Sequence, residues 1–579
     1  MSSQSTSLPT SEPRLEMPGN IDEREHTPDT PAEPPVNNGK HIERFSPFWR
    51  NRLIECGMIA SMALYYVTGN WNLGSAAFFH VNPFYSYPFL VLFAVLSWFR
   101  LSFAVALLPL ALPFYLLQKP VLNHYSYSFS LVEITLGIYL LIAITQLLFK
   151  RNRWQYGLSW QELRDRVGPF AIPVLVFVCA AAISIAVAYD RSVALRDLRR
   201  EIVEPIVYML LLFLCLRERQ DVQRLVGALL ATGFVIALMG LVQYLFFKNT
   251  LVLEDGIRRV SAVYGSANSI GLLFDYVLPF GFAWAFLKSR KSLPTVIAWI
   301  ERVAALIFCA VLLYVLYLTQ SNGAEFAIAA AAVFIVAFSI RNRNVLLIGG
   351  AIAVVALGIG GYLFRRRIES AIFYGHTGAN GVNTLTVRFS LWQAALNMIH
   401  TSPWFGYGLD NWLCYYSLNK TCYTPGMYHY WASKNIFTGA ALVGLHNQPD
   451  LSHPHNVLLQ IWVSMGIFGL LAFIAVVILF FWLFRRILLH LRHHENEHNQ
   501  TLQWITIGVG AAMVAAMVQG TVDSAFLEQD LAYCFWILVG LLLIIRFMSH
   551  TPWRGRVRPD EAVLLPDNSA PPLKQDTVS

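Results

Sequence analysis

Charged residues are scarce in this 579-residue chain. Only 13% of its residues are Asp, Glu, Lys or Arg, whereas 56% are apolar. Soluble globular chains are about a quarter charged and just under half apolar. The length would suit about three or four soluble domains, but this composition predicts one polytopic membrane domain, since each span takes roughly 20 apolar residues. It excludes a soluble enzyme and a typical nucleic-acid-binding protein, so the expected partner is a membrane and not a nucleic acid.

Cysteine is also sparse, and a cleavable signal sequence is not expected. The first apolar run begins near Leu53, too far from the start for such a signal. Cys414 and Cys422 share one loop, and the sequence leaves open whether they form a disulfide, because it does not reveal their separation. Five of the seven cysteines lie in or beside apolar runs and are interpreted as packing residues: Cys56, Cys179, Cys215, Cys309 and Cys534.

Apolar runs occupy the chain between two polar tails. Residues 1–45 are rich in Pro, Ser, Thr and acids, which predicts a disordered tail, and 551–579 form a second tail. Residues 46–550 then form an all-α helical bundle with about 14 apolar runs, which corresponds to 12–14 transmembrane helices because some runs are short. The runs are 53–69, 86–99, 101–119, 129–149, 170–188, 203–216, 222–247, 268–287, 297–318, 323–340, 344–364, 456–484, 503–522 and 529–547.

Basic residues indicate the orientation of the spans. Lys and Arg gather in loops that each follow an even number of spans, and such loops are usually cytoplasmic. Both tails are therefore predicted on the cytoplasmic side. The net charge of +8 is attributed first to this topology, with an anionic partner as the alternative. The basic loops contain Lys150, Arg151, Arg153, Arg164, Arg166, Arg217, Arg219, Arg224, Lys288, Arg290, Lys291, Arg341, Arg343, Arg485, Arg486 and Arg492.

The predicted outer segments also carry arginines, which topology does not require. These segments are 189–202, 248–267 and the large loop 365–455. Guanidinium groups suit a bidentate anion such as a phosphate. The alternative is that many of them form salt bridges with nearby acids. The arginines are Arg191, Arg196, Arg199, Arg200, Arg258, Arg259, Arg365, Arg366, Arg367 and Arg388.

Residues 386–399 of the large loop predict a short interfacial helix. Its apolar face would carry Leu391, Trp392, Ala395 and Ile399, and its polar face Ser390, Gln393, Asn397 and His400. Arg388 falls on the apolar face. A cation there is costly unless it is paired, so it is either a functional residue or an arginine that extends to the lipid headgroups.

His453, Pro454, His455 and Asn456 lie just before a long apolar run. An imidazole at a membrane–water boundary is a suitable general base, although His455 could also cap the helix. A metal site from His446, Asp450, His453 and His455 matches no familiar zinc spacing, so neither a metal nor another cofactor is expected. Gly466 and Gly469 would let a neighbouring helix approach closely.

Taken together, these segments resemble the O-antigen ligase and O-antigen polymerase superfamily over roughly residues 165–545. His455 and Asn456 with Gly466 and Gly469 are similar to the ligase pattern, although Leu470 replaces its threonine. The stretch from Arg388 through Trp392 to Gly406 and Gly408 resembles the arginine-containing helix of the family. Residues 259–268 resemble the motif before a central span, with Ala267 in place of a common proline.

The resemblance implies a GT-C-like membrane bundle and a glycosyltransferase. Such an enzyme would transfer glycan from an undecaprenyl-diphosphate carrier to a glycan, lipid or protein acceptor, with inversion and without a metal, on the outer face of the bacterial cytoplasmic membrane. His455 would be the base, and Arg388 with Arg259 would hold the diphosphate. Arg258, His453, Asn456 and Asn322 are further candidates for substrate binding.

One departure concerns the start of the span at 323–340. Similar proteins often have Ser-Arg-Gly-Ala there, but this chain has Ser321, Asn322, Gly323 and Ala324. Either Arg259 or an arginine from 191–200 replaces the missing arginine, or this member is altered.

A transporter or flippase of lipid-linked sugars is the rival interpretation. It would concentrate charged residues at mid-membrane depth, whereas most charges here lie in loops or at span ends. That distribution favours an enzyme over a transporter. Polymerase, ligase and protein transferase share the same motifs, so the sequence does not separate them.

Overall fold

The computed structural model describes most of the predicted membrane domain. Its described residues are 47–68, 71–73, 76–79, 83–116, 119–121, 124–149, 160–254, 257–288, 293–340, 344, 384–416, 453–494 and 497–553. The chain divides between Arg50 and Asn51, and everything below concerns the second unit, apart from residues 47–50 at the start of the first helix. The predicted tail 1–45 lies outside the described residues. The first three residues of the predicted tail 551–579 are described. The indole of Trp553 donates a hydrogen bond to the Asp165 carbonyl at 2.6 Å.

Helices dominate the described residues, so the predicted all-α polytopic bundle is confirmed. Three short antiparallel hairpins are the only strand pairs described: β1 (Trp71–Leu73) with β2 (Ala76–Phe79), β3 (Lys119–Val121) with β4 (His124–Phe129), and β5 (Val252–Glu254) with β6 (Ile257–Arg259). The α-helices are α1 (Pro47–Val67), α2 (Tyr87–Phe99), α3 (Leu101–Ala106), α4 (Leu131–Leu148), α5 (Trp160–Val167), α6 (Ala171–Val187), α7 (Arg191–Asp197), α8 (Glu204–Cys215), α9 (Arg219–Phe246), α10 (Asn268–Phe286), α11 (Thr295–Thr319), α12 (Asn322–Ser339), α15 (Thr384–Thr401), α16 (Trp412–Tyr416), α19 (Val457–His493), α20 (Glu497–Gln519) and α21 (Gln529–Met548).

Nine helices of the described part are long and apolar enough to cross a membrane. They correspond to nine of the 14 predicted runs: α4, α6, α9, α10, α11, α12, α19, α20 and α21. The runs 86–99 and 101–119 form a pair bent by 119°, which makes a tenth span if it is counted as one. Helix α8 has 12 residues, too few for a span on its own. The run 53–69 forms α1, which is not among these nine helices, and the run 344–364 lies outside the described residues except for residue 344. The described part therefore holds nine or ten candidate spans, fewer than the 12–14 predicted.

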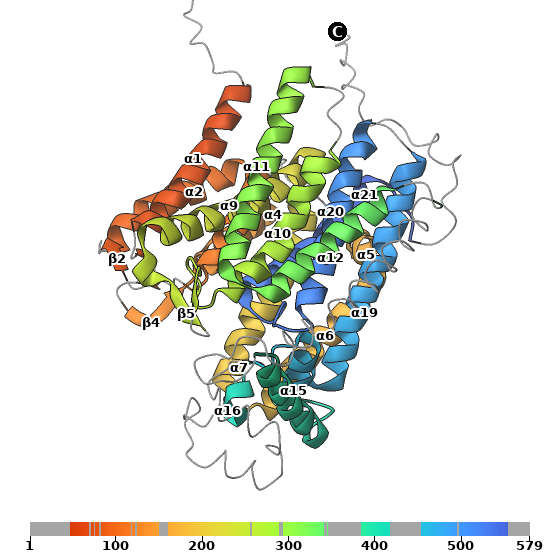
Figure 1. Ribbon diagram of the computed structural model, residues 1–579. Coiled ribbons are helices and arrows are strands. Elements are labelled where there is room, and N and C mark those ends of the chain that lie inside the picture. Colours follow the sequence, from red (N-terminus) through yellow and green to blue (C-terminus); the bar gives the residue numbers. More distant parts are fainter. Residues whose placement is uncertain are drawn as a thin grey trace, which may run out of the picture. The chain divides into compact units, whose positions relative to one another are not determined.

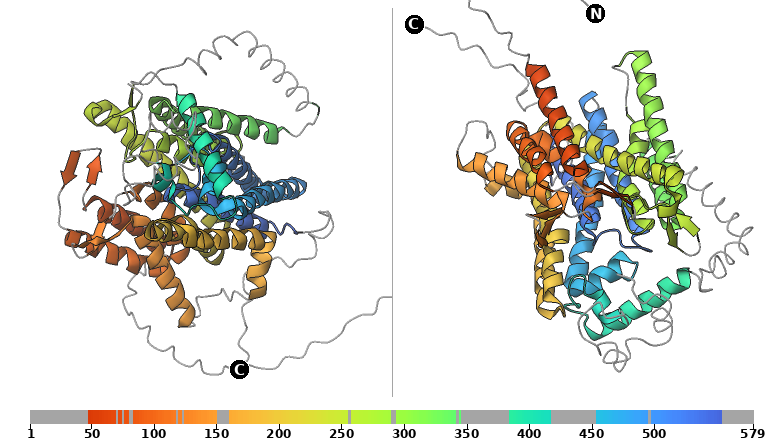
Figure 2. Two further views of the ribbon diagram at one scale, coloured as in Figure 1. Left: turned by 90° about the horizontal axis from the view of Figure 1, so that it is seen from below. Right: turned by 90° about the vertical axis from the view of Figure 1, so that its left-hand side faces the viewer.

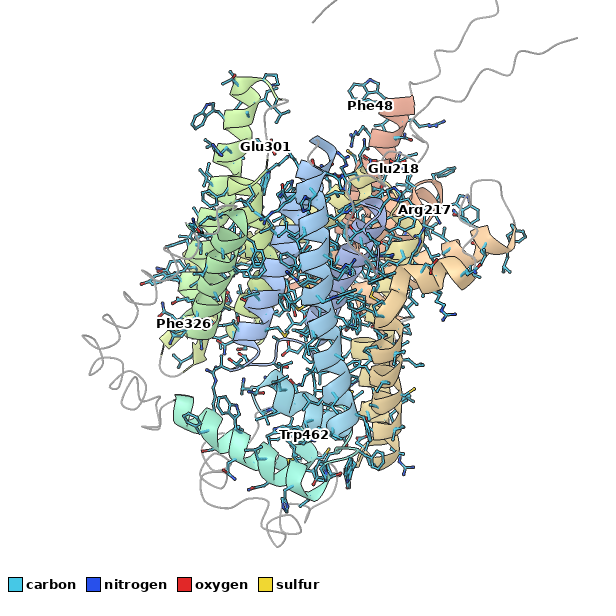
Figure 3. All side chains as sticks on the ribbon, turned by 90° about the vertical axis from the view of Figure 1, so that its right-hand side faces the viewer. Phe48, Arg217, Glu218, Glu301, Phe326 and Trp462 are labelled. Atoms are coloured by element: carbon cyan, nitrogen blue, oxygen red, sulfur yellow. The ribbon has the colours of Figure 1, made fainter. Side chains whose placement is uncertain are left out.

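The centre of the bundle contains α10, α20 and α21. Helix α21 is apolar on all sides and nearly all of its residues are buried, as expected of a helix surrounded by others. Helix α10 packs against α20, α12 and α11. By contrast, α12 presents large apolar side chains outward, and Figure 3 shows Phe326 on its outer side, where it is 74% exposed. An apolar outer surface of this kind suits contact with lipid.

The two ends of the bundle differ in composition. Helices α7, α15 and α16 and the start of α19 lie together at one end (Figure 1). Figure 3 shows Trp462 at this end, whereas Arg217, Glu218 and Glu301 lie toward the opposite end. The predicted basic loop at 217–224 is thus far from the segments that carry His455 and Arg388. Which end faces the cytoplasm stays a prediction, because it depends on the basic loops alone.

Candidate active site

Helix α15 carries Arg388 and lies across one end of the bundle (Figures 1 and 2). The predicted helix at 386–399 is confirmed. Its buried face consists of Leu391, Ala394, Ala395, Met398 and Ile399, which pack with Val463 of α19 and with Tyr407 and Trp412. Ser390 was predicted on the polar face but is buried, because it lies one turn before Ala394 and the buried stripe is wider than expected. Gln393 and His400 are exposed, as predicted.

A break in α19 receives the chain that follows α15. Gly466 has a φ of +72°, so the helix is interrupted there, and the groups around the break lose their helical partners. Residues 403–408 supply new ones. Three backbone hydrogen bonds join the segments: Tyr407 N to Val463 O (2.7 Å), Gly408 N to Ser464 O (3.0 Å) and Ile467 N to Pro403 O (3.0 Å). The Trp462 indole also donates to Pro403 O at 2.9 Å.

Gly466 therefore has a different role from the one predicted. A Cβ atom at this position would lie 1.9 Å from the Trp404 carbonyl oxygen, and a positive φ is rarely adopted by other residues. The close neighbour is the segment 403–408 and not another helix. At Gly469, the nearest atoms to an added Cβ all belong to Met465 of the same helix. The prediction of close helix packing at these two glycines was wrong, because a continuous helix had been assumed.

The segment before α19 is tied to the turn between α20 and α21. Asn456 caps α19, since its side-chain oxygen accepts hydrogen bonds from Leu458 N and Leu459 N at 3.1 and 3.0 Å. Its amide nitrogen donates to Thr521 O at 2.9 Å, and Val457 N donates to Gly520 O at 2.7 Å. The Asn456 side chain thus has a structural role, and its predicted contact with substrate stays a prediction.

Asp523, in this turn, contacts both histidines of the segment. His455 Nδ1 lies 2.7 Å from Asp523 Oδ1, and His453 Nε2 lies 3.4 Å from the same oxygen. An ionised carboxylate only accepts hydrogen bonds, so His455 Nδ1–H is the donor and Nε2 is the basic nitrogen. His455 has a φ of +49°, a backbone conformation that costs a non-glycine residue about 1–3 kcal/mol. The Trp392 indole donates to the His455 carbonyl at 3.3 Å and helps to hold it.

The electrostatics of these groups connect them to Arg388. Burial alone would raise the pKa of Asp523, but His455 and His453 hold that pKa well below its usual value. The pKa of His453 is lowered, chiefly by burial and then by the charges of His455 and Arg388, while Asp523 partly opposes the change. Arg388 is therefore close enough to His453 to act on it electrostatically.

A small pocket opens beside His453. It is lined by Glu201, Asp410, Trp412, His453, Pro454, Gln460, Val463, Ser464 and Leu527. Burial and the neighbouring Asp197 raise the pKa of Asp410 to about 7, and burial with Asp197 and Asp410 raises that of Glu201. The pocket is thus acidic on the side formed by α7, the residues after it and Asp410.

Residues 306–474 match the family model of the O-antigen ligases. The resemblance to the O-antigen ligase superfamily is confirmed. The matched stretch begins in α11 and ends in α19, so it includes Arg388, His455, Asn456 and the break at Gly466. It supports a glycosyltransferase-like enzyme of glycan assembly in a multi-pass membrane protein. No curated protein matches the chain in sequence.

The other predicted phosphate ligands of this chain already have partners or lie exposed elsewhere in the fold. Arg259 is buried and donates hydrogen bonds to Thr319 O at 2.6 Å and to Asn268 Oδ1 at 2.7 Å, so it holds β6 against the end of α11. Arg258 is exposed. Asn322 is exposed at the start of α12, and a Cβ atom on the adjacent Gly323 would lie 3.2 Å from Val522, the neighbour of Asp523.

Several outer arginines form salt bridges, as the alternative interpretation held. Arg196 contacts Asp197 at 2.8 Å and Asp410 at 3.3 Å. Arg199 and Arg200 both contact Glu133 of α4, at 2.5 and 3.1 Å. They are therefore not free to replace the arginine that is missing at Asn322. Arg365, Arg366 and Arg367 lie outside the described residues.

Asp523 is the residue that the sequence analysis missed. It follows α20 in a polar turn between two long apolar helices, and that position was the available signal. It lies 68 residues from His455 in the chain, and the same turn region contains Glu528 and Asp530, so no spacing singled it out. Cys414 is disulfide-bonded, while Cys422 lies outside the described residues.

Proposed function

We propose that this protein transfers or polymerises glycan from an undecaprenyl-diphosphate-linked donor. The reaction would take place at the outer face of the bacterial cytoplasmic membrane, with both chain termini in the cytoplasm. The family match supports glycan assembly, and the position of the basic loops supports the orientation. The acceptor would be a glycan, a lipid or a protein.

The observation that carries the proposal is the 2.7 Å contact between His455 Nδ1 and Asp523 Oδ1. The carboxylate orients the imidazole and leaves Nε2 to take the proton from an acceptor hydroxyl. The hydroxyl oxygen then bonds to the anomeric carbon as the bond to the diphosphate breaks, with inversion. Asp523 stabilises the imidazolium that forms, which is the role of the buried aspartate in other histidine-based sites.

Arg388 would bind the diphosphate. In the described part of the chain it forms no ion pair with an acid, and it is half-buried near His453. An unpaired guanidinium in such a place can donate two parallel hydrogen bonds to phosphate oxygens and offset the charge that develops on the leaving group. Arg258, Arg259 and Asn322 are proposed as further donor contacts, and Gly323, next to Asn322, approaches Val522 of the Asp523 turn. His453 and Asn456 complete the proposed set.

No metal is assigned a part in this reaction, since the base and the phosphate-binding arginine account for the two charges that change. A proton moves from the acceptor to His455, and negative charge moves to the diphosphate beside Arg388. The proposal thus requires activity in the presence of a chelator, which can be checked directly.

A product analysis tests the proposal. Full-length protein in nanodiscs is given undecaprenyl-diphosphate-linked repeat units of its own host, with an added acceptor and EDTA. His455→Ala is compared with His400→Ala, which removes an exposed histidine of α15. We expect wild type and His400→Ala to form the same products and His455→Ala to form none.

The products also separate the alternatives. A ladder of longer lipid-linked chains identifies a polymerase, and a single transfer to the added acceptor identifies a ligase. Movement of intact substrate across the membrane without a new glycosidic bond would instead support a flippase. Full turnover by His455→Ala would contradict the assignment of the base.

A further inference from the structure

His453, His455 and Asp523 bring three metal-ligand atoms together. His453 Nε2, His455 Nδ1 and Asp523 Oδ1 all lie within 4.8 Å of one another. The two histidine nitrogens lie 3.4 and 2.7 Å from the carboxylate oxygen. Two imidazoles and one carboxylate, with a fourth position open to water, are a ligand set that zinc uses in proteins.

The ligands are held in place without a metal. Two hydrogen bonds, from Val457 N and from the Asn456 amide, fasten the segment with the histidines to the turn with Asp523. Ser524 N donates to Asp523 Oδ1 at 2.9 Å, which fixes the carboxylate. Because the ligands are already assembled, a metal would pay little ordering entropy on binding.

The spacing suits a tetrahedral ion. Ligand atoms at about 2.0–2.1 Å from zinc lie about 3.3 Å apart in a tetrahedron. The 3.4 Å separation of His453 Nε2 and Asp523 Oδ1 already fits. His455 Nδ1 and Asp523 Oδ1 must move apart by about 0.6 Å from their hydrogen-bonded 2.7 Å.

We propose that these three residues form a zinc site and that bound Zn²⁺ inhibits the enzyme. The inference rests on the role of His455 in the proposed function. Zinc would bond to His455 Nδ1, and the single ring proton, which Nδ1 now donates to Asp523, would pass to Nε2 by exchange with water, so that the ring stays neutral. His455 with its proton on Nε2 no longer accepts the proton of an acceptor hydroxyl, so transfer stops.

Zinc binding is measured first, apart from activity. Isothermal titration of ZnCl₂ into metal-free, tag-free, full-length protein in nanodiscs should find one zinc per chain. His453→Gln and Asp523→Asn should each weaken that binding at least about tenfold. A double variant with His490→Ala and His494→Ala is the matched control, because it removes another close histidine pair, whose rings lie 4.7 Å apart; it should keep the site.

Arg388→Ala provides a test with the opposite sign. The positive charge of Arg388 acts on His453 and opposes a second cation there. Removing the charge should therefore tighten zinc binding, whereas a variant that merely loosens the site would weaken it. Folding of each variant is checked by thermal unfolding in the absence of zinc.

Turnover is then measured to test whether bound zinc inhibits the enzyme. Zinc should abolish turnover of wild type, and EDTA should restore it. Absence of zinc binding, or binding that is unchanged in His453→Gln and Asp523→Asn, would overturn the zinc site and leave the proposed function standing if His455→Ala is inactive without zinc. Loss of activity in EDTA with recovery in zinc would overturn inhibition, and it would also refute the metal-free mechanism.

Discussion

From the sequence alone, Arg200 and Arg388 are equally good candidates for phosphate binding, because both occur in predicted outer segments. Arg200 lies in the π-helix at 198–203, between α7 and α8, and Arg388 lies in α15. The structure separates them. Arg200 contacts Glu133 at 3.1 Å, and Arg199 beside it contacts the same carboxylate. Arg388 has no acid partner in the described part of the chain and acts on His453 instead. A guanidinium that is already paired must lose its partner before it can bind a phosphate, whereas an unpaired one is available.

The partner of an outer arginine, more than its position in the sequence, therefore decides whether its guanidinium is available to bind a phosphate. Near Arg196 the acids outnumber the arginines, because this one arginine faces Asp197, Asp410 and Glu201. The residues around His453 therefore include a cluster of acids and, in Arg388, a cation that has no acid partner in the described part of the chain. A neutral acceptor sugar beside the acids and an anionic diphosphate beside Arg388 fit this distribution.

The largest expected effect is that of Arg388→Ala. Loss of a donor aimed at developing charge should lower kcat by about 10²–10³-fold, or about 3–4 kcal/mol. Arg388→Lys keeps the charge but loses the bidentate geometry, so it should also be badly impaired. Single-turnover transfer rates measure both, and wild-type rates for Arg388→Lys would contradict bidentate phosphate binding.

Arg200→Ala should affect stability instead of chemistry. The substitution removes one of the two arginines that pair with the buried Glu133 carboxylate and leaves Arg199 as its remaining partner. We therefore expect the free energy of unfolding to fall by about 1–3 kcal/mol. Arg200→Lys is the control that keeps the charge. Thermal unfolding in detergent is the measurement, and a kcat decrease as large as that of Arg388→Ala would break the distinction between the two arginines.

Thr384→Glu would make Arg388 resemble Arg200. Residue 384 lies four residues before Arg388 on α15, the spacing at which a glutamate pairs well with a following cation. The new pair should reduce transfer by about tenfold, because the guanidinium is no longer free for phosphate. Thr384→Gln, of the same size but uncharged, should retain activity. Equal activity of the two variants would argue against an unpaired Arg388.

The smallest effect concerns the acid-rich side. The pKa of Asp410 is raised from 3.8 to about 7, by burial and by Asp197, so the folded protein binds this proton more tightly than the unfolded chain. Folding stability should therefore fall as the pH rises from about 4 to about 7. Asp410→Asn should flatten that dependence slightly, since the side chain is 45% exposed and water screens its charge. Unfolding curves across this pH range are the check.

Local patterns were enough to predict much of the molecule. Nine of the apolar runs are long helices, and periodicity placed Leu391, Ala395 and Ile399 on the buried face of α15. His455 was selected as a candidate because its position before an apolar run is a local signal, and its role as the base stays a prediction. In each case the physical cause, burial of a helix face or of a span, acts within a few turns of the chain.

What the sequence missed depends on contacts between distant segments. Asp523 becomes significant only when the turn after α20 meets His455. Glu133 and its partner Arg200 are separated by 67 residues in the chain, so no local pattern pairs them. Gly466 illustrates a second reason. A glycine in an apolar run is compatible with close packing and with a break, and only the approach of Trp404 to within 1.9 Å of a Cβ there decides between them.

The interrupted helix α19 also imposes an order on biosynthesis. Residues 403–408 leave the ribosome about 60 residues before the carbonyls of Val463 and Ser464 that they will bind, and Asp523 emerges later still. The His455–Asp523 pair can form only after α20 has been made and inserted. A chain released after α19 should reach the membrane with α15 and both histidines in place and yet lack the carboxylate that orients His455.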